Sequence, residues 1–438
     1  MTPTGIASPR RLTAPDPEAE QVGEAAAPPR SLYVHVPFCV SLCPYCDFVV
    51  VAGAAARGPR SRIAAFVAAL RREISLRADA LDATWGLPGS VASGLVARRP
   101  VLDTLYFGGG TPSLLPAEAL IGLIDLVRAR FGIAGSAEIT VEANPGPTER
   151  GDAAALARAG VSRISYGAQA LDPAALRALG RRHLVADVDV AVAEAREAGI
   201  ASVNLDLLYD VPGQTIASFA ATLEHALELG PDHLSLYALS LDDPEAEGLT
   251  GPGGDHLPTP RGARRWREAA RPRQDQDRAA AMYEHAVERL AVAGFDGYEI
   301  SNWARPGHAS RHNLAYWERR PHEAVGPGAH AFDGQARRWN GARLDRYIAA
   351  LTPIDGGRPG LPPGGTEAIS ATAARSEAAI LGLRLGRGVS AQMASTPPLS
   401  DQLAWATELG LVARTAGGRI ALTTSGRLLS NELFARLV

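Results

Sequence analysis

Short apolar runs alternate with amphipathic stretches along roughly the first 240 residues of the chain. Six runs rich in β-branched and aromatic residues predict strands at residues 32–36, 104–107, 138–142, 163–166, 202–207 and 233–238. Between the strands, apolar positions recur at helical spacing, which predicts helices near residues 61–79, 116–130, 152–159, 173–179, 187–198 and 215–229. Strands that alternate with helices form a parallel sheet, so the expected fold class is α/β. Because a closed barrel needs eight such units, six units at residues 31–240 predict a partial, TIM-like (β/α)6 barrel.

The regular alternation stops after residue 240. Residues 241–277 are rich in Pro, Gly, Arg and Asp, and we expect them to form a flexible loop. Residues 278–351 are expected to extend the barrel as an α+β segment, with a helix over 278–293 and a short strand over 297–300. Residues 352–372 are typical of a linker. Residues 373–438 are typical of a small winged-helix-like domain, with helices over 377–385 and 400–409, a hairpin of 411–413 with 420–422, and a last helix from Thr424.

Composition narrows the class of protein. The chain has 438 residues, a formal net charge of −3 and 44 basic residues, all of which are Arg. The absence of Lys excludes Schiff-base, pyridoxal-phosphate and P-loop lysine chemistry. The near-neutral charge does not indicate a nucleic-acid partner. Residues 1–30 lack the apolar core of a signal peptide and are expected to be a disordered extension. No run is long enough to span a membrane, so we expect a cytoplasmic protein.

Three cysteines lie in one eight-residue window: Cys39, Cys43 and Cys46. An odd number of cysteines in a long chain does not make a disulfide framework, so metal binding is the expected use. Three thiolates can hold three irons of a four-iron cluster and leave the fourth iron open to a ligand. Two alternatives remain on spacing alone: a zinc site completed by a nearby side chain such as His35, and three free thiols.

The residues around this window resemble a known signature. Residues 33–48, YVHVPFCVSLCPYCDF, are similar to the signature of the radical S-adenosylmethionine (SAM) superfamily. Over about residues 31–437 the chain more closely resembles the branch that contains the oxygen-independent coproporphyrinogen III oxidases and the related HemW-type haem chaperones. The resemblance implies a [4Fe–4S] cluster on the three cysteines, with SAM chelating the open iron.

Glycines and polar residues follow the predicted strands, at the end where strands of a parallel barrel converge on one site. The run Gly108-Gly109-Gly110-Thr111-Pro112 lets the backbone approach a small zwitterion closely, although a plain tight turn is an alternative. Each polar residue alone could also be a solvated surface residue. The resemblance implies SAM contacts for the following set: Tyr33, Tyr45, Gly109, Gly110, Thr111, Glu142, Gln169, Arg181 and Asp206.

Two features distinguish the oxidases from the chaperones. The oxidases carry a fourth cysteine two residues after the third, and this chain has Phe48 there, as the chaperones do. The run His312-Asn313-Leu314-Ala315-Tyr316-Trp317 matches the HNxxYW motif of the chaperone branch, which makes His312, Tyr316 and Trp317 candidates for haem contact. Imidazole can ligate haem iron and aromatic rings can pack on porphyrin, whereas a packing motif with an incidental His is the alternative. His308 and His330 are alternative axial ligands.

We therefore predict a haem chaperone on a radical SAM scaffold that binds a [4Fe–4S] cluster, SAM and haem. Its expected partners are haem-accepting proteins such as respiratory enzymes and an electron donor such as flavodoxin or ferredoxin. Contact with a membrane is expected only through the acceptors. The alternatives are an oxygen-independent coproporphyrinogen III oxidase and a non-catalytic Zn-binding interaction protein. The Arg-rich segment 261–273 is expected to be a solvated loop, and contact with haem propionates or an acidic partner is the alternative.

Overall fold

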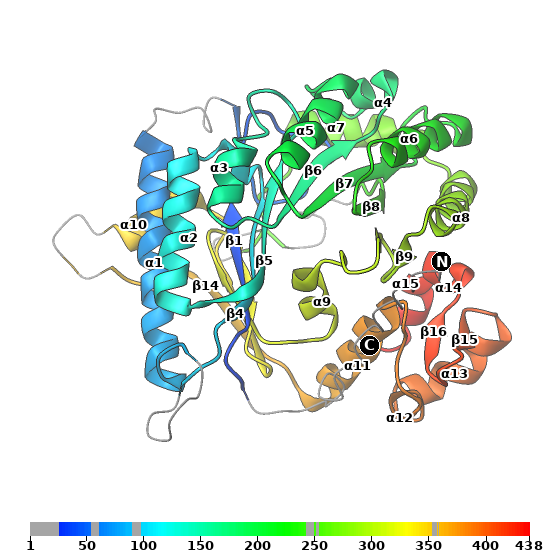
Figure 1. Cartoon of the computed structure of the whole chain (residues 1–438). Coiled ribbons are helices and arrows are strands. Elements are labelled where there is room, and N and C mark those ends of the chain that lie inside the picture. Colours follow the sequence, from blue (N-terminus) through cyan, green and yellow to red (C-terminus); the bar gives the residue numbers. More distant parts are fainter. Residues whose placement is uncertain are drawn as a thin grey trace, which may run out of the picture.

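A twelve-stranded sheet runs through the molecule in the order β14-β13-β12-β11-β1-β4-β5-β6-β7-β8-β10-β9 (Figure 1). Six parallel strands form its centre: β1 (Ser31–Val36), β4 (Leu102–Gly109), β5 (Ile133–Ala143), β6 (Arg163–Gln169), β7 (Ser202–Tyr209) and β8 (His233–Ala238). These are the strands predicted from the apolar runs, and their parallel pairing confirms the partial barrel. Within the described sheet, β14 and β9 are free edges, so the barrel stays open.

The computed structural model describes residues 26–53, 61–89, 98–241, 249–250, 254–352, 357 and 359–438. The predicted N-terminal extension lies outside the described residues up to residue 25, and so do parts of the two segments predicted as a loop and a linker. No helix in the described ranges combines the length and apolar character that crossing a membrane requires.

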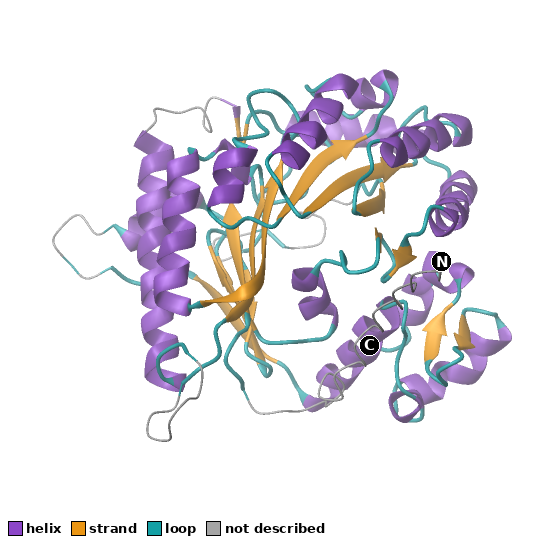
Figure 2. Cartoon of the chain, in the orientation of Figure 1, coloured by secondary structure: helices purple, strands orange, loops and turns teal. Residues whose placement is uncertain are grey.

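Helices pack on the convex face of the parallel strands (Figure 2). They are α1 (Ser61–Trp85), α2 (Ala117–Phe131), α3 (Ala153–Arg158), α4 (Pro173–Ala178), α5 (Val185–Glu197) and α6 (Ile216–Glu228). Alternate residues of β1 explain the layering, since Leu32, Val34 and Val36 are fully buried in the core that includes Phe66 of α1. The residues between them therefore face the concave side, where the polar side chains of the strands gather.

The expected loop over residues 241–277 is wrong at its second half. It contains helix α7 (Arg261–Ala270), a 3-10 turn at Arg271–Arg273 and the start of α8 (Gln276–Val292). Ala263, Arg267 and Ala270 form a buried stripe along α7, at a spacing that places them on one helix face. Arginine is a good helix former, so a run of arginines indicated polarity and not the absence of a helix.

The sheet continues beyond the barrel at both edges. On the β8 side lie β9 (Asp296–Gly297) and β10 (Asn302–Ala304). On the β1 side lie β11 (His322–Val325), β12 (His330–Phe332), β13 (Ala336–Asn340) and β14 (Gly364–Ala368). In the chain, α9 (Arg311–Trp317) precedes β11, and α10 (Leu344–Leu351) lies between β13 and β14. The expected strand over 297–300 is wrong beyond Gly297, where β9 ends; the buried Glu299 carboxylate accepts the backbone N–H of Ser301, and the next strand, β10, begins only at Asn302.

The predicted linker over residues 352–372 is wrong at Gly364–Ala368, which pairs antiparallel with β13 as β14. Its glycines indicated flexibility. Instead, Gly365 leaves room for the ring of Trp339, since a Cβ at Gly365 would lie 2.2 Å from that ring. The missing side chain is therefore what allows this strand to pack.

The C-terminal segment has its own apolar core, which includes Leu383, Leu399, Leu411 and Leu433. Its elements are α11 (Ala371–Arg384), α12 (Ala391–Ala394), α13 (Leu399–Glu408), β15 (Val412–Arg414), β16 (Ile420–Leu422), α14 (Thr424–Leu428) and α15 (Ser430–Phe434). The two expected helices and the hairpin are present, and the expected last helix is divided into α14 and α15.

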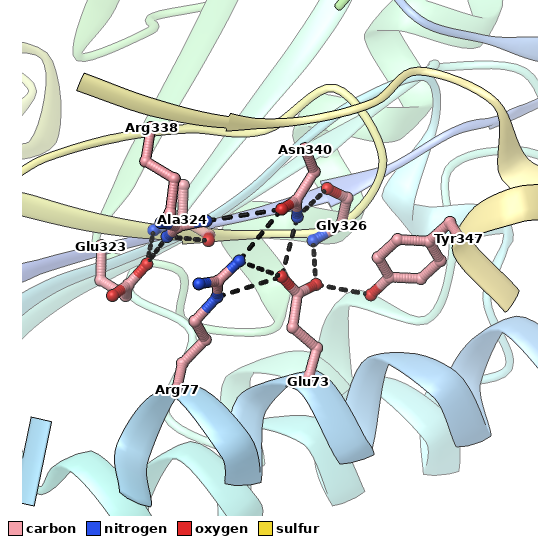
Figure 3. A network of polar contacts seen from close by, with 8 residues as sticks. All are labelled: Glu73, Arg77, Glu323, Ala324, Gly326, Arg338, Asn340 and Tyr347. Carbon is pink, nitrogen blue, oxygen red and sulfur yellow. Dashed lines mark hydrogen bonds and ion pairs between the residues drawn. The ribbon is translucent and has the colours of Figure 1, made fainter. Parts of the chain in front are cut away.

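A buried polar network ties α1 to the strands beyond β1 (Figure 3). Glu73 of α1 is fully buried. Its Oε2 accepts the N–H of Gly326 at 2.9 Å and the hydroxyl of Tyr347 at 2.8 Å, and its Oε1 accepts Nδ2 of Asn340 at 2.8 Å. Arg77, one turn later on α1, supplies the positive charge. Since these partners come from β13, α10 and the turn after β11, one carboxylate sets the position of the whole extension.

Candidate functional site

The three cysteines lie on the loop that follows β1. Two short strands, β2 (Phe38–Cys39) and β3 (Val51–Ala52), pair in parallel and close the base of this loop. Below them, His35 Nε2 lies 2.7 Å from the carbonyl oxygen of Val49. Burial lowers the pKa of His35 to about 4, so the ring is neutral and donates this hydrogen bond. The base of the cysteine loop is therefore fixed to the end of β1.

Helix α7 holds the tip of the same loop. Arg267 is buried and donates from Nε to the carbonyl oxygen of Pro44 and from Nη2 to that of Cys46, each at 3.0 Å. Trp266 donates to the carbonyl of Ala178 at 3.1 Å, and its ring lies 6.4 Å from that of Tyr45. A guanidinium has five donors in a rigid fork, so Arg267 fixes the path of the loop between two cysteines.

A cavity of about 440 Å³ opens beside the cysteine loop on the concave side of the barrel. Most predicted site residues line it: Cys39, Cys43, Tyr45, Cys46, Gly109, Gly110, Glu142, Gln169, Arg181 and Asp206. Tyr33 and Thr111 do not line it and lie one layer behind. Tyr33 Oη is 3.1 Å from His35 Nδ1, and Thr111 Oγ1 points to Cys39 Sγ at 3.6 Å. The structure thus brings together residues spread over more than 160 positions of sequence.

Glycine is required at two positions of the cavity wall. Gly109 has φ +109°, and a Cβ there would lie 2.4 Å from the ring of His35. A Cβ on Gly110 would lie 2.7 Å from the carbonyl oxygen of Phe38. The glycine turn can therefore lie against the cysteine loop only without side chains.

Glu142, at the end of β5, is the acidic group of this wall. Its Oε2 accepts the N–H of Gly109 at 3.0 Å, and its Oε1 accepts the hydroxyl of Tyr106 at 2.7 Å. Burial is the main cause that raises the pKa of Glu142 to about 7, and the two hydrogen bonds act in the opposite direction. The carboxyl group is thus poised to gain or lose a proton near neutral pH.

Arg181 brings a partly buried cation to the cavity wall. Its Nη1 donates to Cys43 Sγ at 3.3 Å, and its Nη2 donates to Asn144 Oδ1 at 2.6 Å and to the carbonyl of Gly167 at 2.8 Å. Asn144 in turn donates to Thr111 Oγ1 at 3.0 Å, which contacts Cys39. Two of the three thiols therefore belong to one hydrogen-bonded chain.

The floor of the cavity is polar and comes from the inward residues of β6, β7 and β8. Asp206 accepts from Ser165 at 3.0 Å and from Asn204 at 2.7 Å. Arg163 is buried beside them, and its Nε and Nη1 have no hydrogen-bond partner within the described part of the chain. Gln169 reaches the cavity because its backbone has φ +64°, where the pairing of β6 with β7 shifts register. Such a left-handed residue in a cavity wall is typical of a ligand site.

The thiols have the chemistry that an iron–sulfur cluster requires. All three cysteines are free, and all three line the cavity. Burial raises the pKa of Cys39 to about 11 and also raises that of Cys46, so metal binding must release their protons. Among the described residues, no three His, Cys, Asp or Glu side chains converge closely enough to share one metal ion. In a four-iron cluster each thiolate binds a different iron, so such a group does not require the three thiols to share one ion.

The HNxxYW segment forms helix α9, which Ser310 caps by accepting the N–H of Asn313. His312 is 1% exposed, and both of its ring nitrogens are in contact: Nδ1 lies 2.7 Å from Thr104 Oγ1, and Nε2 lies 2.8 Å from Tyr316 Oη. Burial lowers the pKa of His312 to about 3, so the ring is neutral. Direct ligation of haem by His312 would require breaking one of these contacts.

The other motif residues point in different directions. Asn313 lines the cavity. Tyr316 stays inside the barrel, 4.6 Å from the ring of His322, whereas Trp317 lies under the guanidinium of Arg384 on α11. The three predicted haem-contact residues thus lie in two surroundings: His312 and Tyr316 contact each other, and Trp317 packs against α11.

Sequence reasoning missed several residues of the site. Tyr106, Asn144, Arg163 and Asn313 line the cavity, and Arg267 holds the cysteine loop. Tyr106 and Arg163 occupy inward positions of predicted strands, so the alternation along the strands could have found them. Asn313 stands inside the quoted motif. No sequence signal identifies Arg267, because its role depends on a contact across more than 200 positions.

Comparison with known proteins gives one consistent result. Residues 33–226 match the family model described as the radical SAM superfamily. The chain is 35% identical over 410 residues to the heme chaperone HemW of Mycobacterium tuberculosis, and the alignment covers 94% of this chain and 95% of that relative. It is 36% identical over 303 residues to the heme chaperone HemW of Escherichia coli, covering 69% of this chain and 70% of that protein.

A solved structure supports the fold. The coproporphyrinogen III oxidase HemN of Escherichia coli, described as a radical SAM enzyme, aligns with a TM-score of 0.73 at 23% identity. The alignment covers 96% of this chain and 92% of that chain. At this identity the match concerns the fold alone.

Proposed function

The chain belongs to the HemW family of haem chaperones within the radical SAM superfamily, and we propose that it binds a [4Fe–4S] cluster, SAM and haem, and delivers haem to acceptor proteins. The observation that carries the proposal is the meeting of three free thiols, a glycine turn and strand-end charges at one cavity. The fold alone would not distinguish a chaperone from an oxidase.

Cys39, Cys43 and Cys46 would hold the cluster. When bound, a cluster of this kind supplies an electron and one iron that is open to a chelating ligand. The chain contributes the position of the thiols, through Arg267 and the β2–β3 pair, and a partly buried hydrogen-bond donor to Cys43 from Arg181.

SAM would lie between the glycine turn and Arg181. Glu142 in its charged form, with the carbonyl groups of the turn, suits the ammonium group of SAM, and the guanidinium of Arg181 suits its carboxylate. Asp206 and Gln169 suit the hydroxyl groups of the ribose. Two partly buried, opposite charges in the wall of one cavity would orient such a zwitterion in one direction.

Haem delivery is favoured over coproporphyrinogen oxidation by Phe48. Its side chain is 65% exposed beside Cys46 and lines the cavity mouth, where the oxidases are expected to carry a fourth cysteine. We further propose that an electron carrier such as flavodoxin or ferredoxin reduces the cluster, and that the acceptors include respiratory enzymes.

Anaerobic reconstitution followed by haem transfer tests the proposal. We expect about four irons with acid-labile sulfide per chain, saturable binding of haem, and transfer of that haem to an apo-haem protein. Cys43→Ser should lose the cluster, whereas Ser41→Ala on the same loop should keep it. Zinc in place of iron and sulfide would contradict the proposal, and so would turnover of coproporphyrinogen III with SAM and a reductant.

A further inference from the structure

The chain has ten histidines. Their surroundings determine which of them has a ring nitrogen that is accessible to a ligand. His312 is buried and has contacts at both nitrogens. His308 is 31% exposed, but it lies 3.9 Å from Asp232, which precedes β8 at the end of the barrel away from the cysteine loop. His330 differs from both, because it lies at the same end of the sheet as the cysteine loop and its side chain is 45% exposed.

His330 is the first residue of β12, and two neighbours fix its ring. Its Nε2 is 2.9 Å from Asp255 Oδ2, and its ring lies nearly parallel to that of its cross-strand partner Trp339, at 19° and 6.0 Å between centroids. The other oxygen of Asp255 lies 3.0 Å from His256 Nδ1. The second ring nitrogen of His330 has no partner among the residues that the structure describes.

This combination is what an imidazole ligand of a metal centre requires. A carboxylate on one ring nitrogen fixes the tautomer and makes the other nitrogen a better ligand. Stacking beside Trp339 restrains the plane of the ring, while the side chain stays 45% exposed. Partial exposure allows a large, flat ligand to approach, which the buried His312 does not.

The backbone under His330 is held rigidly from both sides. Gly326, at φ +103°, lies against the carbonyl of His35, and Gly328 lies against Val49, where a Cβ would come within 2.7 Å of a side-chain carbon. From behind, Glu73 and Asn340 bind the N–H and the carbonyl of Gly326 (Figure 3). Gly328, two residues before His330, therefore lies against the end of the cysteine loop, next to Val50, which lines the cavity.

We propose that His330, oriented by Asp255 and Trp339, ligates the iron of haem on this chain, an inference that rests on the haem binding proposed above. The bound haem would then lie on the concave side beyond β1, next to the cysteine cavity and outside it. The HNxxYW helix would act on the cavity wall and not on the haem iron.

Titration of the full chain with ferric haem, followed by the Soret band and by electron paramagnetic resonance, tests this assignment. His330→Ala should weaken haem binding by about tenfold or more and shift the Soret band, and free imidazole should restore the spectrum. His330→Met should keep binding with an altered spectrum, because thioether sulfur is also a haem ligand. Asp255→Asn should weaken binding by about tenfold through the tautomer of His330.

His308→Ala is the matched control, since it removes another partly exposed imidazole beside an aspartate, and it should leave affinity and spectrum unchanged. Unchanged affinity and spectrum in His330→Ala, while the unaltered chain binds haem, would overturn the ligand assignment alone. Failure of the unaltered chain to bind haem saturably would overturn the proposed function and this inference with it.

Discussion

The hydroxyl of Tyr106 donates a hydrogen bond of 2.7 Å to Glu142, while the ring of Tyr106 stacks on His312 at 5.0 Å between centroids. One side chain therefore joins the HNxxYW helix to the acidic group of the cavity wall. The motif residue His312 supports the cavity through this ring, without lining the cavity itself.

Binding of SAM should strengthen as pH rises through about 7. Burial raises the pKa of Glu142 to about 7, so below that pH the carboxyl group is neutral and attracts an ammonium group less. Glu142→Gln should bind SAM more weakly and lose this pH dependence. Tyr106→Phe should move the midpoint to higher pH, because it removes a hydrogen bond that favours the charged form.

Calorimetric titration of SAM into the cluster-loaded chain at several pH values measures how the affinity for SAM depends on pH. Glu118→Gln, an exposed carboxylate in the first turn of α2, is the control and should follow the unaltered chain. A pH profile that persists in Glu142→Gln would assign the titration to another group.

Removing the imidazole of His312 should lower the free energy of unfolding. His312→Ala leaves the buried hydroxyls of Thr104 and Tyr316 without their partner and opens a cavity, which together cost about 2–4 kcal/mol. Denaturation by urea, monitored by circular dichroism, gives the value. His308→Ala should change it by less than about 0.5 kcal/mol, as is usual for surface positions. Equal stability of both variants would mean that the buried contacts of His312 contribute little.

Much of the fold follows from local patterns in the sequence. The six central strands are apolar because they are buried beneath helices, and Leu32, Val34 and Val36 show the alternation that this burial produces. The ends of such strands converge, which is why Glu142 and Asp206 were expected at one site and are found there. The three cysteines lie within one short sequence window, which likewise predicts that they lie close together in space.

What local patterns did not predict depends on distant partners. Arg267 has a charged side chain and is nevertheless buried, because its guanidinium donates hydrogen bonds to carbonyl groups of the cysteine loop. Gly365 suggested a linker, yet it belongs to a strand because Trp339 occupies the space of the missing side chain. His312 was expected at the surface of a ligand site and is instead inside the barrel, since Thr104 and Tyr316 satisfy both ring nitrogens.

Loosening the cysteine loop should reduce retention of the cluster. Arg267→Ala removes two hydrogen bonds to the carbonyls of Pro44 and Cys46, and a loop with more freedom holds three thiolates less well. We expect chelator-driven loss of iron to accelerate by about tenfold, a usual size for the loss of an outer support. Arg267→Lys should be intermediate, because it keeps the charge and loses the fork.

Arg265→Ala is the matched control, an exposed arginine on the same helix, and iron loss should match that of the unaltered chain. The experiment follows visible absorbance of the reconstituted chain after addition of a chelator. Equal rates for Arg265→Ala and Arg267→Ala would show that α7 does not hold the loop.

Glu73 should be among the costliest carboxylates to remove. Glu73→Ala would leave the N–H of Gly326, the hydroxyl of Tyr347 and the charge of Arg77 buried without their acceptor (Figure 3). Breaking a buried pair in this way costs about 3–5 kcal/mol.

The control, Glu367→Gln, breaks an ion pair with Arg337 in which the carboxylate is 57% exposed, and exposed pairs contribute only about 0–1 kcal/mol. Chemical denaturation measures the free energy of unfolding of both variants. If Glu73→Ala lowers it no more than Glu367→Gln does, the network does not have the role proposed for it. Because the same carboxylate holds the turn before His330, Glu73→Ala should also weaken haem binding, whereas Glu367→Gln should not.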